Sequence, residues 1–229
     1  MTTFSDEGVI KFAAEHREEP LDPRRYGELV ATLLAWREIL VQTGLVGQDA
    51  ARYGGFAYGN VSARVGPPAA ARRRRAFLIS GSGASGRRDA GLPDFAVVEA
   101  YDPERNRVTS YGPCLPSSES MTHGAVYDLG PHVRFVFHVH SPAIWRRSRD
   151  LRLPTTDPKA AYGTPAMAGE VERLWASTAL SDKGIFVMGG HEDGVVVFGK
   201  SAEEAGTVLL RFLAQAYQQE AAGRSAGRQ

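Results

Sequence analysis

Two histidines separated by one residue, His138 and His140, lie in the apolar segment VRFVFHVHS (133–141). This composition predicts a β-strand. Side chains two residues apart project from the same face of a strand, so the two imidazoles would lie side by side, with Phe135 and Phe137 on the other face. Such a pair suits a divalent metal such as zinc. Two hydrogen-bonded histidines at a sheet edge explain the pair alone equally well.

His191 offers a third imidazole. It lies in the glycine-rich loop of GGHEDGVVVFG (189–199), between two apolar segments that are predicted to be strands. Strands on both sides of a loop can hold one of its side chains rigidly in a pocket. Three neutral imidazoles with one open coordination position are typical of a catalytic zinc site. The alternative is an ordinary loop histidine.

A carboxylate with hydroxyl neighbours occurs in PSSES (116–120), where Glu119 lies at the start of a predicted helix. Backbone amides at a helix N-terminus favour anions, so Ser117 and Ser118 would hold a phosphate or carboxylate while Glu119 works as acid or base. Alternatively, the serines only cap the helix and Glu119 only complements its dipole. His123 is on the same helix face and either orients Glu119 or packs in the core.

Two glycine-containing segments, GNVSAR (59–64) and GSGASG (81–86), each accompany a predicted strand. The first places Asn60 at the start of its strand. The second can present several backbone N–H groups to an anion, although a Gly-Ser loop is more often only a turn. Taken singly, neither segment identifies a ligand.

The apolar periodicity predicts the elements that must position these residues. Helices are expected over 7–18, 23–44, 118–129, 164–175 and 201–221, and strands over 59–65, 76–82, 95–102, 107–112, 133–141, 184–190 and 194–199. This mixture predicts a single α+β or three-layer domain over residues 1–221, followed by a disordered tail at 222–229. The basic run ARRRRA (71–76) predicts a solvated loop, with a phosphate or nucleic-acid patch as the alternative.

Composition excludes several classes of protein. The 229 residues include 27 Lys and Arg against 26 Asp and Glu, a balance that argues against a nucleic-acid binder. The single cysteine, Cys114, excludes an intrachain disulfide and a cysteine-rich zinc site. Neither a membrane span nor a signal peptide is expected, so a cytoplasmic location is predicted.

Lysine is scarce, which bears on carbonyl chemistry. Only Lys11, Lys159, Lys183 and Lys200 occur, and all four are expected in polar or turn-like surroundings. A Schiff-base aldolase needs a desolvated lysine, so the sequence favours metal chemistry.

The order GNVSAR, FLISGSG, PSSE, HVH, YGTPAMA and GHEDGVVVFG resembles that of the class II aldolase/adducin family of metal-dependent lyases and epimerases, over residues 24–221. The resemblance implies a three-layer α/β/α fold around a central, mostly antiparallel sheet. It also implies zinc, or another divalent metal such as Mn, Co or Fe. Members are usually homotetramers with active sites at subunit interfaces.

The resemblance also assigns roles to individual residues. It makes His138, His140 and His191 the zinc ligands and Glu119 the catalytic acid/base. The positions that match the family's phosphate site are Asn60, Ser82, Gly83, Ser117 and Ser118.

The sequence departs from the family at several positions. Ala57 stands where phosphate-binding members often carry a hydroxyl residue. Sugar-phosphate aldolases of the family carry a longer segment between the HxH strand and the Gly-Thr turn, with a tyrosine that protonates the leaving aldehyde. Here 141–162 is short and contains only Tyr162, so Tyr162 or a neighbouring subunit would have to supply that proton. Glu192 and Asp193 follow His191, where the family usually has glycine. These acids either line the pocket, form a hydrogen bond to a metal ligand, or lie in a surface turn.

The implied function is that of an aldolase-type lyase. It would cleave or form a C–C bond in a small hydroxy-carbonyl substrate, anionic or sugar-phosphate-like, through a zinc-stabilised enediolate. A dehydratase, epimerase or decarboxylase on the same fold is the alternative. A non-catalytic adducin-like module is less favoured, because adducin heads lack the metal ligands. Neither nucleic acid nor a membrane is expected as a partner.

Overall fold

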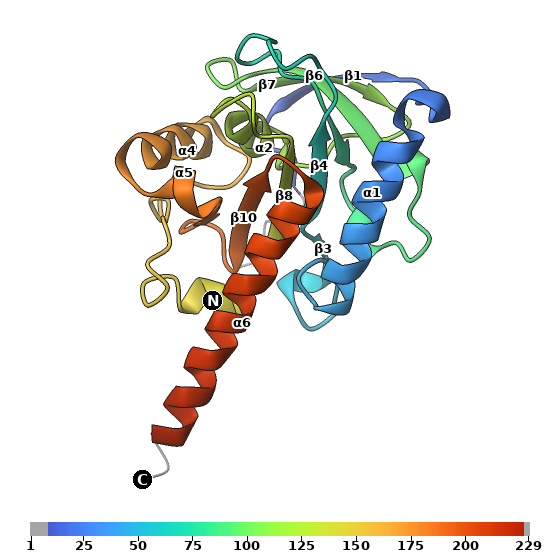
Figure 1. Ribbon diagram of the computed structural model, residues 1–229. Helices are drawn as coiled ribbons and strands as arrows, with labels where there is room; N and C mark the ends of the chain where they lie inside the picture. The colour runs from blue at the N-terminus through green and yellow to red at the C-terminus, as the bar shows by residue number, and fades with distance from the viewer. Residues whose placement is uncertain (1–8, 227–229) are drawn as a thin grey trace.

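An eight-stranded sheet forms the centre of the computed structural model, which describes residues 9–226 and side chains as far as residue 223 (Figure 1). The strand order is β1-β7-β6-β5-β4-β8-β10-β9. These strands are β1 (Ala13–Glu18), β4 (Asn60–Arg64), β5 (Phe77–Ser80), β6 (Phe95–Asp102), β7 (Arg107–Gly112), β8 (Phe135–His140), β9 (Ile185–Val187) and β10 (Gly194–Gly199). Only the β1–β7 pairing is parallel. The mostly antiparallel α+β fold predicted from the sequence is therefore confirmed.

Helices cover both faces of this sheet. One core contains residues of α1 (Pro23–Gln42), α3 (Pro142–Arg146) and α6 (Ala202–Ala226). The second core contains residues of α2 (Ser120–Tyr127), α4 (Pro165–Ser177) and α5 (Leu180–Lys183). Short elements connect them, namely the paired β2 (Gly47–Gln48) and β3 (Ala57–Tyr58) and the one-turn helices η1 (Tyr53–Gly55), η2 (Ala84–Gly86) and η3 (Leu92–Asp94).

Side-chain alternation along β8 divides its residues between the two cores. Phe137 and Val139 pack in the core under α1 and α6, whereas Val136 packs in the core under α2 and α4. His138 and His140 share the parity of Val136, as the sequence predicted, so they face the α2 layer. The element that carries Glu119 therefore covers the face that carries the histidines.

The helix predicted over 7–18 is wrong for its described part. Residues 13–18 form β1, which adds to the sheet edge parallel to β7. His16 explains part of this pairing, because its ring nitrogens lie 3.0 Å from Ser110 Oγ and 3.0 Å from the carbonyl oxygen of Gly112. Bonding to a neighbouring strand outweighs local helix preference in this polar segment. Residues 7 and 8 lie outside the described residues.

The C-terminal helix is longer than predicted. It continues to Ala226, so 222–226 are helical rather than part of a disordered tail, and its far end projects beyond the body (Figure 1). Residues 227–229 lie outside the described residues. Within the described chain, no helix combines the length and apolarity that crossing a membrane requires.

Gly163 controls how closely the loop before α4 approaches the site. Its φ is +65°, and a Cβ there would lie 2.5 Å from the carbonyl oxygen of Ser118. A side chain would thus strain the backbone and push Ser118 out of place. A Cβ added at Gly169, on the exposed face of α4, would have no atom within 4 Å.

We predict that Gly163→Ala lowers the free energy of unfolding by about 1–3 kcal/mol, because both the positive φ and the collision must be relieved. Thermal unfolding followed by circular dichroism measures this as a drop of at least about 2–4 °C. The matched variant Gly169→Ala should be stabilised by about 0.5–1 kcal/mol, since alanine favours the helix. Equal melting of Gly163→Ala and the wild type would contradict the assigned crowding.

Candidate metal centre

Three histidines from two neighbouring segments converge at one end of β8. One nitrogen from each of His138, His140 and His191 lies within 4.8 Å of the others. Their ring centroids are 4.7–5.2 Å apart, and the side chains are 0%, 1% and 7% exposed. The structure thus brings together the three residues that the sequence selected as metal ligands.

Strand pairing explains the position of His191. β10 runs antiparallel to β8 and pairs Gly194 with His140, so the loop before β10 returns over the end of β8. Two backbone bonds close this loop, from His191 N to Met188 O (3.2 Å) and from Gly194 N to His191 O (3.0 Å). A Cβ at Gly194 would lie 2.7 Å from His191 Cδ2, so glycine there leaves room for the imidazole.

The donor set fits a divalent metal. Burial first, and the neighbouring imidazoles second, hold the pKa of His138 and of His140 well below the usual range. Burial also lowers the pKa of His191 to about 3. All three rings are therefore neutral at pH 7 and can offer lone pairs without first losing a proton.

Asn60 fixes the orientation of His138. The register between β4 and β8 places the two residues opposite each other, and Asn60 Nδ2 lies 3.3 Å from His138 Nδ1. Nε2 of His138 has no hydrogen-bond partner among the described residues although it is fully buried. A metal ion would satisfy this atom, and an engaged second ring nitrogen is a usual feature of metal-bound histidine.

Glu119 lies beside the histidines at the beginning of α2. Its Oε1 is 4.0 Å from His191 Nε2, and the residue is 1% exposed. Burial raises the pKa of Glu119 to about 7, while a hydrogen bond from Thr122 and, to a smaller extent, the positive charge of Lys11 oppose this rise. The carboxyl group is thus able to take up and release a proton near neutral pH.

A small polar hollow adjoins the histidines. Its lining comprises Ala57, Gly59, Asn60, Gly81, Ser82, Gly83, Ser85, Ser117 and Ser118. All five residues that the sequence nominated for substrate binding are in this set. The hollow measures about 10 Å³, roughly the space that one water molecule needs, and no charged side chain lines it.

Tyr162 approaches the cluster through its ring. The ring centroid lies 4.6 Å from that of His191. The hydroxyl accepts a hydrogen bond from Val9 N (3.2 Å) and lies 3.4 Å from Val9 O. The hydroxyl is thus bonded to the chain just before β1. The role of Tyr162 as a proton donor stays a hypothesis.

Lys11 is a neighbour that the sequence did not indicate. Its Nζ lies 3.8 Å from the centroid of the Tyr162 ring, and its charge acts on both Glu119 and His191. The expectation that every lysine lies in a polar or turn-like setting is therefore wrong for Lys11. The segment that carries Lys11 was interpreted as a helix, and no spacing in it indicates contact with Tyr162.

His123 and Asp193, which the sequence placed near the metal ligands, make separate hydrogen bonds. His123 is fully buried, and its Nδ1 lies 2.7 Å from Ser62 Oγ. Asp193 accepts a hydrogen bond from the hydroxyl of Tyr53 (2.7 Å).

The segment that carries Tyr53 was also not indicated by the sequence. The Tyr53 ring lies edge-on to His140 with centroids 4.5 Å apart, and Arg52 donates to its hydroxyl (2.7 Å). The sequence offered no signal for this contact, because 49–56 has no strand or helix periodicity.

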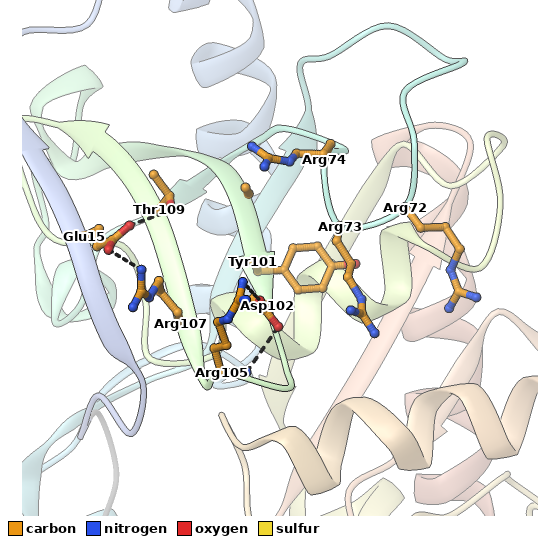
Figure 2. Close-up of a pocket in the computed structure, with 10 residues that line it drawn as sticks. Glu15, Arg72, Arg73, Arg74, Tyr101, Asp102, Arg105, Arg107 and Thr109 are labelled. Carbon is orange, nitrogen blue, oxygen red and sulfur yellow. Dashed lines mark hydrogen bonds and ion pairs between the residues drawn. The ribbon is translucent and has the colours of Figure 1, made fainter.

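A separate hollow of about 410 Å³ lies at the β1 edge of the sheet (Figure 2). It is lined by Glu15, Arg72, Arg73, Arg74, Ala100, Tyr101, Asp102, Arg105, Arg107 and Thr109, none of them a residue of the metal centre. Acidic side chains pair with most of its arginines, for example Glu15 with Arg107 (2.7 Å) and Glu104 with Arg73 (3.0 Å). The run 71–76 is thus a solvated loop with compensated charge, as the sequence favoured.

Comparison with known proteins identifies a family for most of the chain. The profile described as "Class II Aldolase and Adducin N-terminal domain" matches residues 47–218. No match was found among the curated proteins.

Several solved structures share the fold. An L-fuculose 1-phosphate aldolase is 18% identical, with a TM-score of 0.60 over 87% of this chain and 88% of that one. A sugar-phosphate aldolase from Thermotoga maritima is 16% identical, with a TM-score of 0.61 over 89% and 97%. YgbL from Escherichia coli, a putative aldolase/epimerase/decarboxylase, is 17% identical, with a TM-score of 0.58 over 83% and 87%. At these identities the neighbours establish the fold alone.

We predict that His138→Ala removes most of the bound metal, because it deletes one of three ligands and the partner of Asn60. Protein purified with added zinc and then dialysed should retain about one metal ion per chain in the wild type and at most about one tenth of that in the variant. Mass spectrometry of the metal content gives both values. His132→Ala is the control, since His132 lies outside the cluster. An equal metal content in both variants would contradict the ligand assignment.

Proposed function

The chain belongs to the class II aldolase and adducin family, and on this premise we propose that it is a metal-dependent, aldolase-type lyase. Its substrate would be a small hydroxy-carbonyl compound with an anionic end. The observation that carries the proposal is the buried three-histidine cluster with the Glu119 carboxylate 4.0 Å from its edge. A non-catalytic binding module has no need for this costly arrangement of buried ionisable groups.

His138, His140 and His191 would hold the metal as neutral ligands. A divalent metal bound there supplies a Lewis acid that draws electron density from the substrate carbonyl. Two rings come from β8 and the third from the loop that the pairing of β8 with β10 returns over it, so little reorganisation is needed when a substrate binds.

Glu119 would move the proton. With a pKa raised to about 7 by burial, it can take a proton from the substrate and return it within one turnover. A hydrogen bond from the backbone N–H of Glu119 to Ser117 Oγ (3.2 Å) helps to hold Glu119 at the start of α2.

The polar hollow has room for about one water-sized group, so it would hold one oxygen of the anionic end. Asn60, Ser82, Gly83, Ser117 and Ser118 border it and offer hydroxyl, amide and backbone donors. Binding one end of the substrate there would orient the carbonyl toward the histidines.

A second candidate reaction rests on the position of Tyr162. Its hydroxyl bonds to the backbone of Val9, so it is not directed freely at a leaving aldehyde. This favours an epimerase, a dehydratase or a decarboxylase. These enzymes also begin by removing a proton or breaking a C–C bond next to the carbonyl, but they do not all need a tyrosine that protonates a leaving aldehyde. Zinc as the metal, a homotetramer with interface sites and a cytoplasmic location complete the proposal and rest on the family alone.

We predict that Glu119→Gln lowers the rate of carbon-bound proton exchange by about 10²–10⁴-fold, because the isosteric amide cannot accept the proton. NMR in D₂O measures this exchange on hydroxy-carbonyl compounds such as dihydroxyacetone, dihydroxyacetone phosphate and hydroxypyruvate. Metal content should be unchanged. Glu172→Gln, on the exposed side of α4, serves as control and should exchange at the wild-type rate.

Two results would count against the proposal. Wild-type protein with full metal content that exchanges no proton on any compound of the panel would exclude a lyase or epimerase for this substrate class. A Glu119→Gln variant as fast as the wild type would remove Glu119 from the chemistry. Products of the wild-type reaction separate C–C cleavage from dehydration, epimerisation and decarboxylation.

A further inference from the structure

One buried arginine lies directly against the loop that borders the polar hollow. Arg37 is on α1, is 6% exposed, and its Nη2 donates to three backbone carbonyls. The acceptors are the oxygens of Ala84 (3.3 Å), Ser85 (2.9 Å) and Arg87 (2.5 Å). These carbonyls belong to η2 and its flanking residue, in the GSGASG segment and just after it.

The charge of Arg37 is not matched by a carboxylate. Among the described residues it forms no ion pair, and its Nε has no hydrogen-bond partner. Burial lowers its pKa, and the charges of Glu38 and Asp94 oppose this effect without contact. Asp94 is already bonded to Arg87 Nη1 (2.9 Å) and Gly91 N (2.8 Å). Because an arginine stays protonated in proteins, Arg37 is a buried cation held by backbone dipoles alone.

The same loop contacts the polar hollow. Ser82, Gly83 and Ser85 line the hollow, while the carbonyls of Ala84 and Ser85 face Arg37. No side chain that lines the hollow carries a charge. The positive charge of Arg37 would therefore act on an anion bound there through the loop rather than by direct contact.

We propose that Arg37 is the counter-charge of the anion subsite and acts on a bound phosphate or carboxylate group through residues 81–87. It is a positioning residue, because its hydrogen bonds to the carbonyls of Ala84, Ser85 and Arg87 hold the loop that lines the hollow. Its charge is weakly screened because it is buried, so an anion in the hollow is attracted from behind the loop. The anion in turn offsets the cost of burying Arg37.

This inference takes one feature from the proposed function, namely that the substrate has an anionic end. It predicts that charge matters more than hydrogen bonding at position 37. Arg37→Gln keeps an N–H donor but loses the charge, whereas Arg37→Lys keeps the charge but loses the planar donor group.

The chain also offers a matched control. Arg64 is 2% exposed, and its Nη2 donates to the carbonyls of Pro67 and Pro68 (2.9 Å each). It shares the burial and the backbone partners of Arg37 but lies at the opposite end of β4 from Asn60. Arg64→Gln therefore removes the same kind of group away from the hollow.

The test is isothermal titration of metal-loaded protein with inorganic phosphate and, separately, with acetate. The anion that binds more tightly to the wild type identifies the class held by the subsite. For that anion, we expect Arg37→Gln to weaken binding by about tenfold or more, since the Coulomb attraction between opposite charges several ångströms apart in a partly buried setting is of that order. Arg37→Lys should bind within about threefold of the wild type, and Arg64→Gln should bind equally well. Metal content should be the same in all four proteins.

Three results would overturn the inference. Equal losses in Arg37→Gln and Arg37→Lys would mean that Arg37 only shapes the loop. Equal losses in Arg37→Gln and Arg64→Gln would mean a general loss of structure, and if Arg37→Gln fails to fold, a tenfold loss in Arg37→Lys overturns the inference by itself. Wild-type protein that binds neither anion would remove the subsite while leaving the metal and Glu119 to be judged by metal content and proton exchange.

Discussion

The register between β8 and β10 is the constraint on which the site depends. It pairs His140 with Gly194 and His138 with Val196, so the chain that connects β9 to β10 returns over the end of β8 with His191 on it. A one-residue slip in this pairing would turn the β10 side chains to the opposite face and separate His191 from the other two rings. The buried valines of β10 prevent such a slip, because Val195 and Val197 fill one core and Val196 the other.

Burial then sets the chemistry. The histidines are neutral because their environment excludes water, and the same exclusion raises the pKa of Glu119 toward 7. Among the described residues, cations border this region at three places: Lys11 lies against Tyr162, Arg52 against Tyr53, and Arg37 behind the 81–87 loop. A buried site that excludes water and has cations at its border favours the binding of a metal and of an anionic substrate.

The sequence predicted those parts that depend on local pattern. Alternation along 133–141 correctly placed both histidines on one face, and the motif order identified the family and the fold. The N-terminal helix was wrong because His16 finds its partners on β7, which local periodicity does not contain. Lys11, Tyr53 and Arg37 escaped notice for a related reason. Each reaches the site through a tertiary contact between segments far apart in the chain, and none belongs to a motif.

The central claim is that three imidazoles bind a metal ion, and X-ray absorption at the zinc edge of zinc-loaded protein tests it most directly. If the three histidines bind the zinc ion, its neighbours will be only nitrogen and oxygen at about 2.0–2.1 Å, with the scattering of about three imidazole rings. A sulfur neighbour at about 2.3 Å, or scattering from fewer than two rings, would contradict it.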